Sequence, residues 1–175
     1  MPSKKQFQKE VKMKKIHFYK SSLNTIDYVL ELLSLLSVLC TIVLFVVFWI
    51  DAPQIVPVHY NIYGIADGFG NKTTLIILPV ISIVTYAGLT LLNKFPYIFN
   101  FPVKVTEQNR LILYKNATRV VRWTKLIMCL LFAVIVWQQI GVNNRLNNIP
   151  LFILIACLVI CFIVYIVKMI RIGKS

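Results

Sequence analysis

Acidic residues are scarce in this chain, and their scarcity limits the classes of protein to which it can belong. Only six of the 175 residues are Asp or Glu, against nineteen Lys or Arg, which gives a formal net charge of +13. Charged residues make up 14% of the chain and hydrophobic residues 58%, whereas about a quarter of an ordinary soluble domain is charged. Together with a mean hydropathy of +0.76, this composition excludes an ordinary soluble domain and indicates that the lipid bilayer is the main solvent.

Side chains that bind metals are also few. The chain has two histidines and four cysteines, and every cysteine lies inside an apolar run without a C-x-x-C motif. Cys157 and Cys161 are four residues apart on one helix face, and small packing residues are a better interpretation than a disulfide or a metal site. One histidine and one aspartate in the segment around His59 are too few ligands for zinc. We therefore expect no metal site and no cofactor.

Nucleic-acid binding, the other common use of a basic excess, is not expected either. The basic residues cluster beside apolar runs and not along a soluble helix. Residues 1–20 contain seven lysines and one glutamate but no nucleic-acid-binding motif. Anionic lipid attracts such lysines by about 1 kcal/mol each. We interpret residues 1–27 as a basic cytoplasmic tail beside the lipid head groups.

Four long apolar runs dominate the rest of the chain. They are Leu32–Ile50, Thr73–Asn93, Leu126–Asn144 and Leu146–Val167. About twenty such residues span the hydrocarbon core, and the first run is too long, and lacks the cleavage site, for a signal peptide. We predict spans at 28–50, 75–92, 126–143 and 150–168. The predicted fold is an all-α integral membrane protein with four transmembrane helices, packed as a small bundle, alone or as an oligomer.

The distribution of Lys and Arg predicts the orientation of these spans. Basic residues number seven in the tail, one in 51–72, seven in 93–125, one in 143–149 and three at the C-terminal end. Cytoplasmic segments carry the excess of Lys and Arg. We therefore expect both termini, including residues 169–175, and residues 93–125 in the cytoplasm. Residues 51–74 and 144–149 would lie outside.

The inner segment 93–125 is expected to begin irregularly and then to form a helix that continues into the third span. Thr106 is typical of a helix cap, with an acidic residue favourable in the first turn. On this helix Lys115, Arg119 and Arg122 share one face. Two interpretations stay open: orienting charges that contact the lipid head groups, and a docking face for an acidic cytoplasmic partner.

The outer segment 51–74 cannot be a continuous helix, because five of its first twenty residues are Pro or Gly. Residues 58–63 alternate as in an extended segment, with His59 and Asn61 on one face. Gly64 would end this segment, and Asp67-Gly68 is typical of a tight turn. The candidate ligand-binding residues are His59, Asn61, Gly64, Asp67 and Lys72. The competing interpretation is that these residues only satisfy the loop backbone near lipid.

The same segment resembles a known family. The pattern is Pro53-x-x-Val56-Pro57-x-His59-x-Asn61-x-x-Gly64-x-x-Asp67-Gly68-x-Gly70-x-Lys72, followed by an apolar run with Pro79. It is similar to the domain of unknown function 1648, found in bacterial membrane proteins that include the SdpI-type immunity proteins, and the resemblance covers roughly residues 35–90. This chain departs from the pattern at Ala52, Ile65 and Asn71. SdpI-type proteins also carry further membrane segments after the domain.

The resemblance implies an integral protein of the bacterial inner membrane. No nucleophile with a base is visible, so we expect a protein without enzymatic activity. The outer segment would recognise an extracellular toxin, peptide or envelope component, which would give immunity or sensing.

The alternative is a small transporter or an accessory subunit of a membrane complex. Gln138 and Gln139 are the best polar candidates within a span for such a role. Asp27 and Glu31 lie one helical turn apart at the start of the first span. We expect them to pair with nearby lysines at the membrane interface.

Overall fold

The structure, a computed structural model, describes residues 23–139 and 145–174. Most of the predicted basic tail 1–27 lies outside these residues. The same holds for residues 140–143 of the predicted third span and for residue 144 of the short outer connection.

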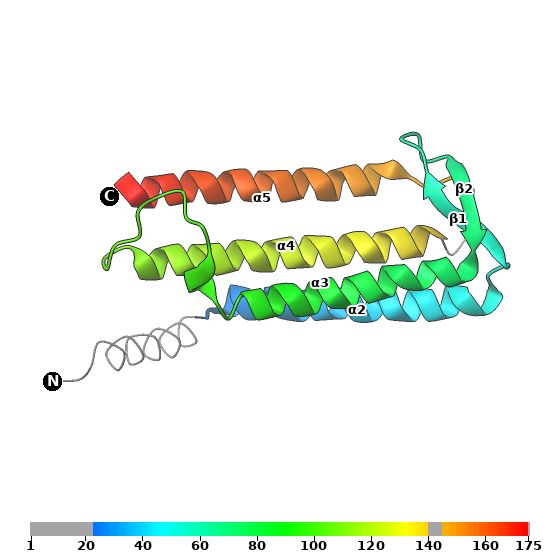
Figure 1. The fold of residues 1–175 in the computed structure, drawn as a ribbon, viewed down its shortest axis with the longest axis horizontal. Coiled ribbons are helices and arrows are strands. Elements are labelled where there is room, and N and C mark those ends of the chain that lie inside the picture. Colours follow the sequence, from blue (N-terminus) through cyan, green and yellow to red (C-terminus); the bar gives the residue numbers. More distant parts are fainter. Residues whose placement is uncertain (1–22, 140–144, 175) are drawn as a thin grey trace.

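Four long helices form the described part of the chain (Figure 1). They are α2 (Thr25–Asp51), α3 (Ile77–Leu92), α4 (Arg110–Gln139) and α5 (Asn148–Lys174). The short helix η1 (Lys72–Ile76) leads directly into α3. Helices α2, α4 and α5, and α3 together with η1, are long and apolar enough to cross a membrane. The prediction of a mostly helical, four-helix membrane fold is thereby confirmed.

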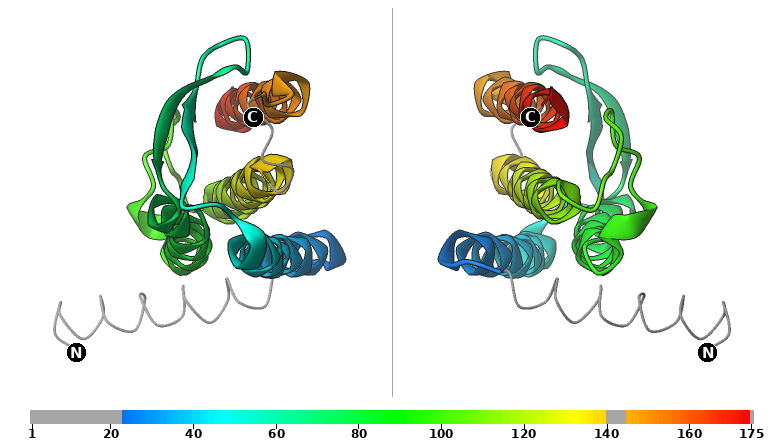
Figure 2. Two further views of the ribbon diagram at one scale, coloured as in Figure 1. Left: turned by 90° about the vertical axis from the view of Figure 1, so that its right-hand side faces the viewer. Right: turned by 90° about the vertical axis from the view of Figure 1, so that its left-hand side faces the viewer.

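Successive helices run in opposite directions, so the connections gather at two ends (Figure 1). One end carries a β-hairpin and the start of α5. The other carries the start of α2, the connection between α3 and α4 with its short helix η2 (Pro96–Ile98), and the end of α5. Viewed along the bundle, α2, α3 and α4 group together and α5 stands beside α4 (Figure 2). Helix α4 is therefore the central element.

The buried face of α2 is lined by small hydroxyl side chains. Ser34, Ser37 and Thr41 are buried, and each donates to the backbone carbonyl four residues earlier, at 2.6, 2.8 and 2.9 Å respectively. Internal hydrogen bonds of this kind satisfy a hydroxyl where water is absent. Small side chains also let neighbouring helices approach closely. The buried face of α2 therefore combines small side chains, which allow close approach, with the apolar Leu30, Val38 and Phe48.

The hairpin consists of β1 (Ile55–Tyr60) and β2 (Ala66–Asn71), paired antiparallel with a bulge between Pro57 and His59. The predicted tight turn at Asp67-Gly68 is wrong, because both residues lie within β2. The chain reverses instead between the strands, where Gly64 adopts a positive φ of 75°. The physical reason is local: an asparagine and a left-handed glycine supply the turn chemistry earlier in the chain.

Candidate functional site

The turn of the hairpin is held by one side chain and one glycine. The Asn61 Oδ1 accepts hydrogen bonds from the backbone N–H groups of Tyr63 (2.9 Å) and Ile65 (3.1 Å). Gly64 follows in the left-handed region, which glycine enters without steric cost. Both predicted site residues, Asn61 and Gly64, therefore act on the turn backbone in this structure.

The turn is attached to the connection between α4 and α5. The Leu146 N–H donates to the Gly64 carbonyl (2.7 Å), and the Asn148 side-chain amide donates to a turn carbonyl (2.7 Å). Ile65 and Arg145 form an isolated antiparallel bridge. A β-carbon at position 64 would lie 2.2 Å from the Leu146 carbonyl oxygen. Glycine at this position is therefore what allows the turn to approach the connection.

The base of the hairpin is fixed by Lys72, at the opposite end from the turn. Its ammonium donates to the Ala52 carbonyl (3.3 Å) and lies 5.2 Å from the centroid of the Trp49 ring. A buried apolar cluster beneath it joins α2, β1 and η1, and consists of Phe48, Ala52, Val56 and Leu75. Lys72 is therefore an anchor of the hairpin base and does not converge with the other predicted site residues.

His59 and Asp67 meet across the hairpin as an exposed polar pair. The His59 Nδ1 lies 2.5 Å from the Asp67 Oδ1, and the two side chains are 72% and 43% exposed. Gly68 stands opposite His59 in the register, and a β-carbon there would lie 2.9 Å from the His59 Cβ. Because Gly68 has no side chain, there is room for the His59 side chain opposite it. Within the described residues, the second imidazole nitrogen and the second carboxylate oxygen make no hydrogen bond, so both can meet a ligand.

A cleft of about 320 Å³ adjoins His59 of this pair. Its walls come from the hairpin, the starts of α3 and α5, and the end of α4, and they include His59, Asn61, Leu78, Gln139 and Asn148. Burial raises the pKa of the Tyr60 phenol, one of the lining residues. A mostly apolar cleft with a few polar groups is the usual form of a small ligand site.

A second polar site lies among the helices near the opposite end of the bundle. The Arg119 Nε lies 3.1 Å from the Asp27 Oδ1. The Arg122 Nε lies 3.1 Å from the Glu31 Oε1, and Lys125 donates to the other Glu31 oxygen. Arg122 and Lys125 are buried. These five side chains form an ion-pair cluster that joins α2 to α4.

Helix α3 completes the ion-pair cluster. The Lys125 ammonium donates to the Thr90 Oγ1 (2.8 Å) and lies 4.7 Å from the centroid of the Tyr86 ring, within the range of a cation–π contact. Three cations face two carboxylates, so the cluster has one cation in excess. The Arg122 Nη1 makes no hydrogen bond within the described residues, although it lies 3.8 Å from Asp27.

The ion-pair cluster corrects two predictions. The sequence predicts lysine partners at the membrane interface for Asp27 and Glu31, whereas the structure pairs them with two arginines and a lysine of α4. The predicted face of Lys115, Arg119 and Arg122 is not a free docking surface, because only Lys115 stays exposed. An unpaired guanidinium among apolar helices is costly, so the arginines turn toward the carboxylates. Periodicity along each helix could not reveal this pairing, because Arg119 lies 92 positions from Asp27.

The helices and the hairpin define a multi-pass membrane protein, and comparison with known sequences finds a family to which part of it is similar. Residues 36–83 match the family described as Domain of unknown function (DUF1648). The match falls on the motif that predicted it, and it indicates no specific relation to SdpI-type proteins. An uncharacterized protein of Archaeoglobus fulgidus is 33% identical over 72 residues, covering 33% of this chain and 39% of that relative. No solved structure matches the chain.

The matched segment contains one of the two polar sites and not the other. It contains the hairpin with His59 and Asp67, together with half of α2 and part of α3. The charged residues of the ion-pair cluster all lie outside it. The hairpin therefore lies within the part of this chain that matches the family.

Proposed function

We propose that this is a non-enzymatic membrane protein whose hairpin recognises a peptide or envelope component on the outer side of a bacterial inner membrane. Immunity to a toxin or sensing of the envelope would be the result. The observation that carries the proposal is the exposed His59–Asp67 pair, 2.5 Å apart, on a hairpin fixed at both ends and beside a cleft.

The hairpin has the properties of a recognition surface. Its turn is bound to the connection before α5 and its base to α2, so a ligand meets a preformed shape and little ordering entropy is lost on binding. Large apolar side chains, among them Ile62 and Tyr63, are exposed at the turn. The sheet has two strands in the described chain. Each strand therefore has an edge that an extended peptide could join by backbone hydrogen bonds.

The distribution of charge supports the outer position of the hairpin. The two connections at its end of the bundle hold one basic residue each, in 51–72 and 143–149, whereas residues 93–125 at the other end hold seven. By the positive-inside rule, the basic end faces the cytoplasm and its anionic lipids. Both termini would then be cytoplasmic.

A challenge experiment tests this function. A strain that lacks the protein is exposed to membrane-active peptides and competitor supernatants, and is complemented with wild type, His59→Ala, Asp67→Asn or Gln54→Ala. Gln54 is exposed on the same hairpin and lies outside the pair, so its variant is the matched control. We expect selective sensitivity that wild type and Gln54→Ala rescue and the pair variants do not. Rescue by all variants at equal membrane abundance would contradict recognition through the pair.

A small transporter or accessory subunit is the second candidate. This candidate is favoured by the burial of Lys125 in an ion-pair cluster that has three cations and two carboxylates. Ionisable groups within spans often mark ion or substrate pathways. Gln139, the other polar candidate, is buried against the cleft beneath the hairpin. Substrate flux in proteoliposomes that requires Lys125 or Gln139, but not His59, would favour this function over recognition.

A further inference from the structure

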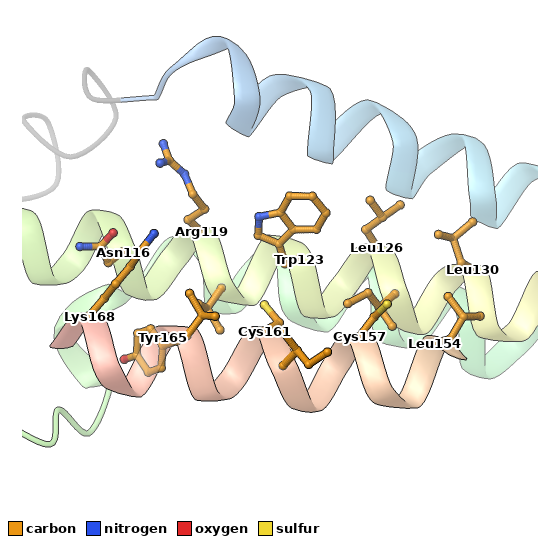
Figure 3. A pocket seen from close by; sticks show the side chains of 14 residues that line it. Asn116, Arg119, Trp123, Leu126, Leu130, Leu154, Cys157, Cys161, Tyr165 and Lys168 are labelled. Carbon is orange, nitrogen blue, oxygen red and sulfur yellow. The ribbon is translucent and has the colours of Figure 1, made fainter. Parts of the chain in front are cut away.

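An apolar groove of about 480 Å³ runs between α4 and α5 (Figure 3). Trp123, Leu126 and Leu130 of α4 line one wall, and Leu154, Cys157 and Cys161 of α5 line the other. Helix α5 is otherwise little covered, since no residue of its most apolar 18-residue window is buried in the bundle. The groove is therefore an apolar recess at the edge of the molecule, where a membrane protein meets lipid.

The two ends of the groove differ in polarity. Asn116, Arg119 and Lys168 line the end nearer the ion-pair cluster, whereas Leu130 and Leu154 line the end that lies deeper along the helices. Leu154 and Lys168 are 14 positions apart, which is about 21 Å along a helix. One leaflet contributes about 15 Å of hydrocarbon. The groove therefore extends from the level of the lipid head groups to the middle of the membrane.

The polar end of the groove is positively charged. Arg119 belongs to the ion-pair cluster, in which three cations face two carboxylates. Lys168 is exposed, and it has no ion-pair partner among residues 23–139 and 145–174. The Arg119 guanidinium itself donates to both Asp27 carboxylate oxygens (3.1 and 3.4 Å), so it contributes only through the excess charge of the cluster. An anion at this end would meet Lys168 and the Asn116 amide, which can donate a hydrogen bond.

We propose that the groove binds an anionic phospholipid of the leaflet at this end. One acyl chain lies between α4 and α5, and the phosphate meets Lys168 and Asn116 near the positively charged ion-pair cluster. Trp123 lies between Arg119 and Leu126 along α4, farther toward the apolar end than Arg119 (Figure 3), a position typical of the aromatic residues near a membrane interface.

Charge favours a lipid over a second copy of this chain as the occupant. Copies related by a two-fold axis along the membrane normal would place Lys168 and Arg119 of both chains at the same level. The resulting repulsion of like charges would oppose that packing. An anionic lipid neutralises the same groups and fills the apolar recess.

Native mass spectrometry of the full chain tests this proposal, with phosphatidylglycerol as the anionic lipid and phosphatidylcholine as the neutral one. Lys168→Gln removes a head-group contact, and Arg171→Gln is its control, because Arg171 is exposed on the same helix end outside the groove. Cys157→Trp fills the groove. Its control is Ile163→Trp, since Ile163 is 56% exposed outside the groove. Circular dichroism verifies that each variant is folded.

We expect phosphatidylglycerol to bind more tightly than phosphatidylcholine. Lys168→Gln should weaken phosphatidylglycerol binding about fivefold, the effect of one cation beside anionic lipid, and Cys157→Trp should weaken binding of both lipids. Equal binding of the two lipids, or equal losses in Lys168→Gln and Arg171→Gln, would overturn the proposal. So would a lipid-free dimer that forms disulfides between the Cys161 residues of two chains, since the groove would then hold a second copy.

Discussion

Lys125 shows most clearly what a single side chain contributes to this bundle. It is fully buried, yet it contacts Glu31 of α2 and both Thr90 and Tyr86 of α3. One residue of α4 therefore joins three helices by polar contacts. Because lipid competes weakly for such contacts, they can specify which helices pack together. We infer that the ion-pair cluster sets the arrangement of α2, α3 and α4.

Lys125→Met should destabilise the bundle. It removes one of the two cations that face Glu31, and removing one partner of a buried ion pair typically costs 3–5 kcal/mol. We expect a loss of about 3 kcal/mol, at the lower end, because the Glu31 side chain is 29% exposed. Thermal unfolding of the purified protein in detergent measures it.

Two further variants show whether the lost charge pairing is the cause. Lys125→Met combined with Glu31→Gln should recover much of the stability, because the change removes the carboxylate charge while the amide oxygen can still accept from the Arg122 Nε. Lys115→Met removes an exposed lysine of the same helix and should change stability by less than about 0.5 kcal/mol. A double variant no more stable than Lys125→Met would show that packing, and not charge, explains the loss.

Single residues also show which features could be predicted from the sequence and which could not. Charge counts show that Asp27 and Glu31 are exceptional, because only six acidic residues exist. Their partners could not be read off, since Arg119 lies 92 positions from Asp27 and periodicity describes only neighbours on one helix. The interpretation that assigned them lysines used nearness in the chain, and the structure shows that helix packing decided the pairing.

At the scale of elements, the long apolar runs predicted the helices because about twenty uncharged residues have no stable alternative in a bilayer. The helix expected to run from Thr106 into the third span is present as α4, which begins at Arg110. Two features were not predicted: the pairing of its charged turns with α2, and the position of the hairpin turn. The hairpin turn was misplaced because Asp67-Gly68 is a strong turn signal, whereas the contact of Gly64 with Leu146 depends on a distant connection.

Gly64→Ala should loosen the hairpin from the connection between α4 and α5. The new β-carbon would lie 2.2 Å from the Leu146 carbonyl oxygen, and the left-handed conformation costs a non-glycine residue about 1–2 kcal/mol. We expect a loss of stability of at least this size, and faster hydrogen exchange at the Leu146 amide. Gly88→Ala is the control, because a β-carbon there meets no atom within 4 Å and alanine favours a helix by up to about 1 kcal/mol. Similar losses in both variants would contradict a specific role for Gly64.

The whole molecule has two unlike ends. The end with the hairpin exposes apolar side chains and the His59–Asp67 pair. The other end holds the ion-pair cluster, the positive end of the α4–α5 groove and most of the Lys and Arg. Because successive helices run in opposite directions, these features lie at two opposite ends of the bundle. The orientation of the bundle in the membrane therefore determines on which side of the membrane each feature lies.

Cysteine labelling in cells tests that orientation. In a background whose four cysteines are replaced by alanine, Gln54→Cys marks the hairpin and Lys115→Cys marks the basic end, and both native residues are exposed. A maleimide that cannot cross membranes should label position 54 in intact cells. It should label position 115 only after permeabilisation, because the basic end faces the cytoplasm. The opposite pattern would place the hairpin inside, and an extracellular peptide could not then be its ligand. The groove between α4 and α5 could still bind an anionic lipid, from the other leaflet. The proposal of peptide recognition and the proposal of lipid binding can therefore fail separately.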